Sequence, residues 1–222
     1  MASSFLFKME KRMTWEEFFE IVALEANKGN TLKEIIPHKV YQSLHSLEQN
    51  WSYKWNEKLL KFQIDPNSEN TQLLELPPDL KSIITCKVSS SDFSECSREL
   101  SMLDPSDFEF GNNSEPDGYW LQGDSYLWFS AGVKPGMSGA LWYNAFTLRE
   151  DMVGDNTSPM LKHGYQALLG LTMQNLAAYC REPQWTEQYG TLAEIGIKTL
   201  HIADEELRRL TSTISFGGIS DE

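Results

Sequence analysis

The side chains that could bind a metal ion or act as nucleophiles are few and scattered. No two of the four histidines, His38, His45, His163 and His201, have a spacing that places two metal ligands on one helix face. The three cysteines, Cys86, Cys96 and Cys180, form no Cys-x-x-Cys pair, and their odd number argues against a disulfide framework. We therefore predict no metal site and no cofactor, and we expect Cys86 and Cys180 to be reduced core residues.

One glycine-rich stretch superficially resembles two kinds of catalytic loop. The segment 132–139 lacks the Lys-Ser/Thr pair of a phosphate-binding loop, and no helix is expected to follow it. Within it, Gly136-Met137-Ser138-Gly139 lies between predicted strands, unlike a nucleophile elbow. The acidic runs Glu16-Glu17 and Asp204-Glu205-Glu206 are expected in solvated or terminal helix positions, so no acid–base pair stands out. We predict no catalytic residue, which indicates a protein that is not an enzyme.

Three tryptophans, Trp120, Trp128 and Trp142, are expected on neighbouring strands of one sheet. Alternation along these strands gives mixed faces, which favour packing within the core or against another subunit. A row of indoles on one sheet face could also stack on sugar rings, as in a carbohydrate- or surface-binding module. We predict that the three tryptophans pack between subunits, and sugar binding remains the alternative.

The elements that would position these residues begin with two helices. Thr14 and Glu17 fit a capping box, Met13 and Phe18 occupy the hydrophobic-staple positions, and Gly29 is placed for a left-handed C-cap. A second helix is predicted to start near Pro37. Its apolar stripe steps by three or four residues: Val40, Leu44, Leu47, Trp51, Trp55 and Leu59.

The middle of the chain predicts strands. Short apolar runs occur at 71–76, 83–88, 119–122, 125–129 and 141–146. Gly123-Asp124 separates two of them and predicts a two-residue hairpin turn. Between the runs 83–88 and 119–122, the acidic and turn-rich stretch 89–118 is long for a loop in a compact domain.

The helical period returns after residue 155. Ser158 and Pro159 are typical of a helix start, and the apolar face runs from Leu161 to Tyr179. A further helix follows Pro183 and ends with Arg208 and Arg209 in its last turn. The tail from Thr211 to Glu222 is rich in serine and glycine, with three apolar residues, Ile214, Phe216 and Ile219.

This order predicts an α+β fold: a four-helix bundle made of two helical hairpins, with an inserted antiparallel β-sheet module and an extended C-terminal tail. The expected divisions are 13–61 and 156–211 for the bundle, 62–155 for the β module with its long acidic loop, and 212–222 for the tail.

Charge limits the possible partners. The net charge is −13, and residues 62–157 contain five basic against 16 acidic residues. A surface this acidic repels phosphate, which excludes a tight DNA binder that works by counterion release. No apolar run approaches about 18 residues, and the apolar run at residues 5–7 is too short for a signal peptide. We expect no membrane association and a reducing, cytoplasmic environment.

Several motifs, taken in order, resemble a known family over about residues 14–210. These are Leu76-Pro77-Pro78-Asp79-Leu80, Tyr119-x-Leu121-x-Gly123, Leu141-x-Tyr143, the helix from Tyr165 to Tyr179, and Trp185-x-x-x-Tyr189. In this combination the chain resembles the head-to-tail adaptor (connector) proteins of tailed bacteriophages, the family that includes the tail tubular protein A of short-tailed phages. It departs from the family in the acidic stretch 89–118 and in a more aromatic sheet.

The resemblance implies a structural virion protein in the neck between capsid portal and tail, assembled in the host cytoplasm. Such subunits form a homo-oligomeric ring, usually a dodecamer, under the portal protein, and they provide the attachment platform for the tail nozzle or tube protein. Viral double-stranded DNA passes through the ring during genome ejection without sequence-specific binding. On this basis we expect portal docking by Leu210, Ile214, Phe216 and Ile219. We expect tail-facing contacts from Asp107, Phe108, Glu109 and Phe110.

Overall fold

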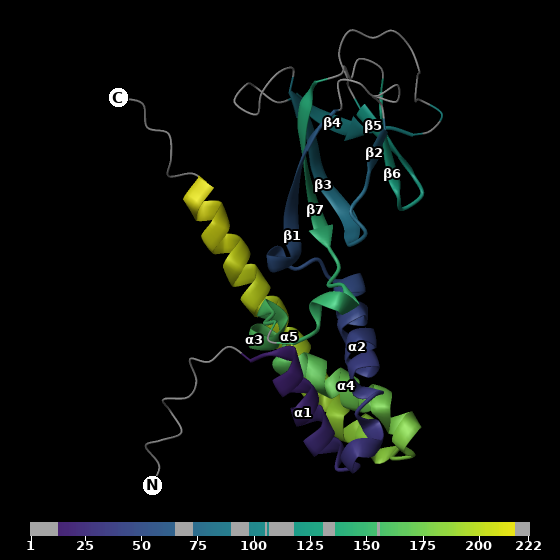
Figure 1. Ribbon diagram of the computed structural model, residues 1–222. Helices are drawn as coiled ribbons and strands as arrows, with labels where there is room; N and C mark the ends of the chain where they lie inside the picture. The colour runs from purple at the N-terminus through teal and green to yellow at the C-terminus, as the bar shows by residue number, and fades with distance from the viewer. Residues whose placement is uncertain are drawn as a thin grey trace. The chain divides into compact units, whose positions relative to one another are not determined.

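The computed structural model describes residues 13–64, 73–89, 98–104, 106, 118–130, 136–154 and 156–215, and within these residues the chain is α+β (Figure 1). It divides into two compact units. Unit 1 is helical and comes from residues 1–55 and 147–222, whereas unit 2 contains the sheet and comes from residues 56–146.

The described part of unit 1 contains five α-helices and short 3-10 turns. The α-helices are α1 (Trp15–Ala26), α2 (Ile36–Asn50), α3 (Pro159–His163), α4 (Tyr165–Cys180) and α5 (Gln184–Ser215). The 3-10 turns are η2 (Gly29–Leu32), η3 (Lys54–Asn56, whose last residue belongs to unit 2) and η4 (Arg149–Asp151).

The start of α1 has the predicted capping box. The Thr14 hydroxyl accepts a hydrogen bond from the Glu17 backbone N–H at 3.2 Å, and the Glu17 carboxylate accepts the Thr14 N–H at 3.0 Å. The predicted C-cap at Gly29 is wrong, because Asn27 takes the left-handed conformation with φ 47° and ends the helix. Asparagine tolerates this conformation better than most residues.

The second predicted helix is shorter than its apolar stripe. Helix α2 ends at Asn50, and Trp51 is already extended with φ −143° and ψ 141°. Leu59, the last member of the stripe, lies on a strand instead. The helical spacing of Trp51 and Trp55 is therefore a coincidence of two aromatic residues in a connecting segment that packs against the helices.

The helix predicted after Ser158 is divided in two. Ser158 caps α3 as expected, accepting the Met160 N–H at 3.1 Å. Gly164 then leaves the helical conformation, with φ −112° and ψ 14°, and α4 starts at Tyr165. Unit 1 is therefore built from five described helices, and the predicted bundle of two helical hairpins is wrong.

Helices α4 and α5 approach each other closely at small residues. A Cβ atom added to Gly196 would lie 2.2 Å from the backbone nitrogen of Ala167, and one added to Gly170 would lie 2.6 Å from that of Ala193. Small residues at these crossing points allow the two backbones to pack directly together.

Unit 2 contains a curled, mixed seven-stranded sheet, a half-barrel. Its strands follow the spatial order β1-β7-β3-β4-β5-β6-β2. They are β1 (Glu57–Gln63), β2 (Leu73–Glu75), β3 (Leu80–Ser89), β4 (Arg98–Met102), β5 (Gly118–Gln122), β6 (Tyr126–Phe129) and β7 (Ser138–Ala145). Buried side chains on one face form the core, including Cys86, Leu127, Phe129 and Leu141.

The predicted antiparallel module differs from this sheet in two ways. Strand β7 pairs with β1 and β3 rather than with the β5–β6 hairpin, and β4 pairs with β5 in parallel. The small inserted antiparallel sheet is therefore wrong. The β5–β6 hairpin itself is present, but its loop has three residues, 123–125, and Gly123 has φ +61°.

The C-terminal prediction also changes. Helix α5 continues to Ser215, so the segment 212–215 is helical rather than part of an extended tail. The predicted tail residues Phe216 and Ile219 lie outside the described residues.

Candidate assembly surfaces

The end of α5 carries the first predicted docking residue. Leu210 is 65% exposed. Asp204 is the last fully buried side chain of α5 among the described residues, so the turns beyond it are half-buried or exposed. The side chain of Ile214 lies outside the described part of the chain, as do Phe216 and Ile219, so the structure does not test their predicted contact.

Asp204 anchors α5 to the segment that follows α2. Its carboxylate accepts hydrogen bonds from the Trp51 indole N–H at 3.0 Å, the Lys54 backbone N–H at 2.5 Å and Arg208 Nε at 2.8 Å. Arg208 also donates to the Ser52 carbonyl oxygen. The expected solvated position is wrong for Asp204, which is fully buried. The sequence does contain a signal for this burial: Leu200 and Arg208, four residues before and after Asp204, place Asp204 on a helix face that also carries an apolar residue and a possible ion-pair partner.

Aromatic rings surround this anchor. Trp51 stacks on His201 with centroids 4.3 Å apart, and Tyr53 stacks on Trp55 at 4.9 Å. Burial, and then the negative charges of Asp204 and Glu48, raises the pKa of the Tyr53 phenol well above its ordinary value. The Tyr53 hydroxyl therefore stays protonated, in a segment that is held by both polar and ring contacts.

Glu48 forms a second buried anchor, near the end of α2. Its carboxylate accepts the Thr147 backbone N–H at 2.9 Å and the Thr147 hydroxyl at 2.6 Å. Thr147 is the first residue of unit 1 after the chain returns from unit 2, and residues 51–55 are the last before it leaves. The two buried acids thus fasten both of these segments to the helices of unit 1. Neither anchor was predicted from the sequence.

Two of the predicted subunit-packing tryptophans form a pair in unit 2. Trp120 on β5 and Trp128 on β6 are cross-strand partners, and both are half-buried on the face opposite the core. Trp128 Nε1 donates a hydrogen bond to Gln122 Oε1 at 2.7 Å. Tyr126, two residues along the same strand, is 40% exposed. This face of the hairpin therefore presents an aromatic surface.

Trp142 lies on a different part of the sheet. On β7 it stands between Leu59 of β1 and Thr85 of β3, and β3 and β4 separate β7 from β5. The prediction that all three tryptophans occupy neighbouring strands is therefore wrong for Trp142. Trp142 and Leu59 are 45% and 47% exposed, so they form an apolar patch on the outer face of the sheet. Their role in subunit packing stays a prediction.

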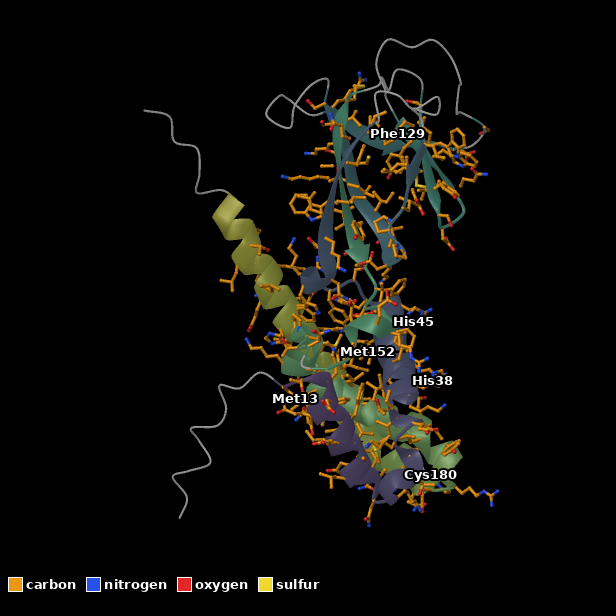
Figure 2. The ribbon with its side chains drawn as sticks, viewed as in Figure 1. Met13, His38, His45, Phe129, Met152 and Cys180 are labelled. Atoms are coloured by element: carbon orange, nitrogen blue, oxygen red, sulfur yellow. The ribbon has the colours of Figure 1, made fainter. Side chains whose placement is uncertain are left out.

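Other predicted residues are dispersed or undescribed. The four residues expected to face the tail, Asp107, Phe108, Glu109 and Phe110, lie outside the described residues. Within the described ranges, no cluster of three or more His, Cys, Asp or Glu side chains could hold a metal ion. His38 and His45 lie on α2, whereas Cys180 ends α4 (Figure 2).

The cysteine predictions can be compared with the structure for two residues. Cys86 is fully buried on β3, and burial raises the pKa of its thiol to about 12, so it is protonated and chemically inert at neutral pH. Cys180 is only half-buried, and Cys96 lies outside the described residues.

Comparisons with known proteins add no identity. No protein-family model matches the chain, and no curated protein matches it. Among the described helices, none is long and apolar enough to cross a bilayer.

Proposed function

We propose that this chain is a structural subunit of a head-to-tail adaptor ring, which docks on a bacteriophage portal and provides the platform for the tail. The observation that carries the proposal is the C-terminal part of α5. Asp204 and Arg208 hydrogen-bond α5 to residues 51–54 of unit 1, and the turn beyond them presents Leu210 at 65% exposure. A helix end that carries an exposed apolar residue is suited to insertion into a groove on a larger partner.

Apolar surface on unit 2 supports assembly of several copies. Leu59 and Trp142 are adjacent cross-strand residues, each nearly half exposed. Single exposed apolar residues are ordinary, but a contiguous pair that includes a tryptophan is typical of a contact surface. In a ring, such patches are covered by the neighbouring subunit.

The charge of the chain agrees with a channel through which DNA passes without binding. A net charge of −13 leaves few phosphates neutralised, so DNA near this surface would slide rather than adhere.

Electron microscopy tests the proposal directly. We would image the full chain alone and after mixing with the portal protein encoded in the same genome. The adaptor function requires a ring that stacks coaxially on the portal. A chain that stays monomeric and ignores the portal would contradict it.

Two variants test the role of the α5 end. Deletion of residues 213–222 and the substitution Leu210→Glu should both abolish portal binding while leaving the circular dichroism spectrum unchanged. Ile195→Glu is the matched control, because Ile195 is 53% exposed on the same helix but four turns earlier. Equal portal binding by Leu210→Glu and Ile195→Glu would show that the end of α5 is not the docking site.

A carbohydrate-binding module is a second candidate, favoured by the cross-strand pair of Trp120 and Trp128. Aromatic rings on an outer sheet face can stack on sugar rings. Such a module would remain monomeric and would shift its tryptophan fluorescence when glycans are added. The adaptor function predicts no such shift.

A further inference from the structure

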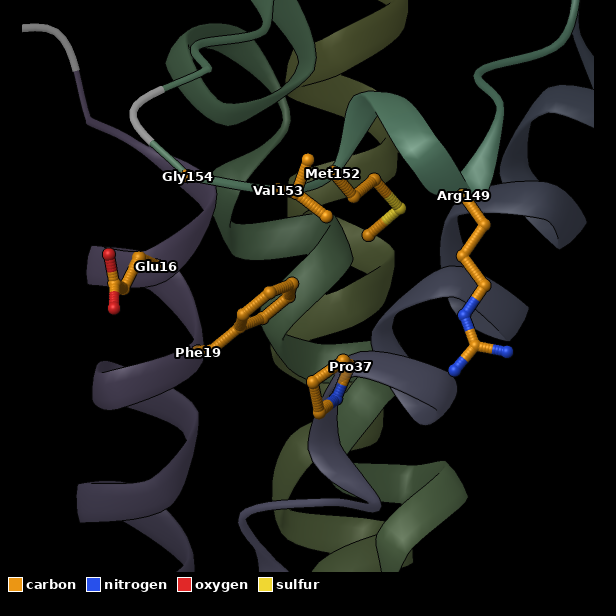
Figure 3. A pocket seen from close by; sticks show the side chains of 7 residues that line it. All are labelled: Glu16, Phe19, Pro37, Arg149, Met152, Val153 and Gly154. Carbon is orange, nitrogen blue, oxygen red and sulfur yellow. The ribbon is translucent and has the colours of Figure 1, made fainter.

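A pocket of about 410 Å³ opens on unit 1 between α1, the start of α2 and the segment that contains η4. Its floor is apolar, and the ring of Phe19 extends toward the other apolar lining residues, Pro37, Met152 and Val153 (Figure 3). Val153 is 59% exposed, so the floor is open to a partner. A volume in this range is typical of sites that bind ligands or side chains.

Two opposite charges flank this apolar floor. Glu16 and Arg149 line the pocket on either side of Phe19 (Figure 3). Within the described part of the chain, neither side chain has a hydrogen bond or an ion pair. An occupant that complements the pocket would therefore combine apolar side chains with one nearby cation and one nearby anion.

The N-terminal sequence of this chain has that combination. Residues 1–12, which lie outside the described residues, contain Phe5-Leu6-Phe7 followed by the charged residues Lys8, Glu10, Lys11 and Arg12. In an extended segment, Phe5 and Phe7 project to the same side. The segment 216–222 has apolar and acidic residues but no cation, so it offers nothing to pair with Glu16.

The described chain enters α1 from the side away from its own pocket. Thr14 forms an antiparallel bridge with Thr157, and the Trp15 N–H donates to the Asn156 carbonyl oxygen at 3.2 Å. In antiparallel pairing, the residue before Thr14 lies beside those after Thr157. The pocket residues 152–154 lie in the opposite direction along that segment.

We propose that residues 5–10 of one copy occupy the pocket of a neighbouring copy. Phe5 and Phe7 cover the apolar floor, while the long side chains of Lys8 and Glu10, which leave the opposite side of the extended segment, reach over the rim of the pocket to Glu16 and Arg149. This contact is heterologous, because the arm and the pocket are different surfaces, and its repetition gives a ring when the rotation between successive copies closes. The inference rests on the proposed adaptor function, since it describes how the ring subunits are joined.

Binding of a peptide tests the contact without requiring a ring. A fluorescein-labelled peptide of residues 1–13 would be titrated into the full-length double variant Phe5→Ser/Phe7→Ser. We expect binding that weakens roughly tenfold or more when Val153→Glu is added, because the floor then carries a charge. Leu24→Glu is the matched control, since Leu24 is 77% exposed on α1 but does not line the pocket. Absence of binding, or equal loss in both variants, would overturn the proposal.

Mixing two full-length variants tests whether the contact is between copies. The Phe5→Ser/Phe7→Ser variant keeps a functional pocket, and the Val153→Glu variant keeps a functional arm. Each should be monomeric alone in analytical ultracentrifugation, while the mixture should form a 1:1 dimer. A mixture that remains monomeric overturns the proposal. It is also overturned if the wild-type chain is monomeric and does not bind the labelled peptide, because the arm then fills the pocket of its own copy.

The outcomes separate this inference from the adaptor function. If the arm variant still forms rings on the portal, the arm contact fails and the adaptor function stands. If the wild-type chain ignores the portal, the adaptor function fails, and the peptide and mixing experiments still decide whether the arm binds the pocket.

Discussion

The carboxylate of Glu48 on α2 receives both hydrogen-bond donors of Thr147, the first residue of unit 1 after the sheet. The backbone N–H lies at 2.9 Å and the hydroxyl at 2.6 Å, and Glu48 is only 1% exposed. A buried acid is thus satisfied by two donors from a residue 99 positions away, at the point where the chain returns to the helices.

Substitution of Glu48 should destabilise the fold. Glu48→Ala leaves the two Thr147 donors without their acceptor and opens a cavity, so we expect a loss of about 2–4 kcal/mol in the free energy of unfolding. Urea denaturation followed by tryptophan fluorescence measures it. Glu206→Ala, an exposed position on α5, should change stability by less than about 0.5 kcal/mol. Similar losses in the two variants would contradict the anchoring role.

The Asp204 anchor predicts a more selective effect. Asp204→Asn keeps the size of the side chain but retains one acceptor oxygen for three donors, from Trp51, Lys54 and Arg208. We expect a loss of about 1–3 kcal/mol, again measured by urea denaturation. The neighbouring pair of Glu205 and Arg209, at 3.8 Å, is solvent-exposed. Glu205→Gln should therefore be nearly neutral, and an equal cost would argue against a special role for Asp204.

The close packing of α4 on α5 predicts opposite results at two glycines of α5. Gly196→Ala places a methyl group 2.2 Å from the Ala167 backbone nitrogen, so the helices must separate at a cost of about 1–3 kcal/mol. At Gly190 the nearest atom is Gln174 Nε2, at 3.1 Å on a side chain that can move. Gly190→Ala should be neutral or stabilise by up to about 1 kcal/mol, because alanine favours helix. Thermal unfolding of both variants checks this, and a stabilising Gly196→Ala would refute the close approach.

Stability should fall in mildly acidic solution because of His163. Burial, and then the positive charge of Lys162, lowers the pKa of the His163 ring, which also stacks on Trp55 at 5.7 Å. Below the ordinary value of about 6.5, the unfolded chain takes up a proton that the folded chain resists, so unfolding becomes easier as the pH falls. In the His163→Gln variant, the free energy of unfolding should decrease less between pH 8 and pH 5.5 than in the wild-type chain. The control His38→Gln, at an exposed position, should show the same decrease as the wild-type chain when the free energy of unfolding is measured by urea denaturation at each pH. If this free energy depends on pH identically in all three chains, His163 is not the cause.

Local features of this fold could be read directly from the sequence. The capping box at Thr14 and the start of α3 at Ser158 depend on residues within one helical turn, and both were predicted correctly. The β5–β6 hairpin was also predicted, because Gly123 provides the positive φ that its turn requires. In each case the residues that interact are close together in the chain.

Local patterns failed where the deciding partner is distant. Leu59 continues a helical stripe in the sequence, yet it belongs to β1 because residues 57–63 pair with residues 138–144 of β7. Asp204 lies in an acidic run that predicts a solvated position, and the donors from Trp51 and Lys54, together with Arg208, make its burial favourable. The mixed sheet order has the same origin, since periodicity indicates that a strand forms but not which strand lies beside it.

The sequence by itself determined the starts of α1 and α3, the position of the β5–β6 turn, the acidic charge and the scattered positions of the histidines and cysteines. The tertiary structure alone decided the strand order, the burial of Glu48 and Asp204, and the pairing of Trp120 with Trp128 apart from Trp142. The physical reason is the distance along the chain between the residues that interact. Caps and turns are satisfied by hydrogen bonds within a few residues, whereas strand neighbours and buried acids depend on partners from distant parts of the chain, such as Trp51, which is 153 residues from Asp204.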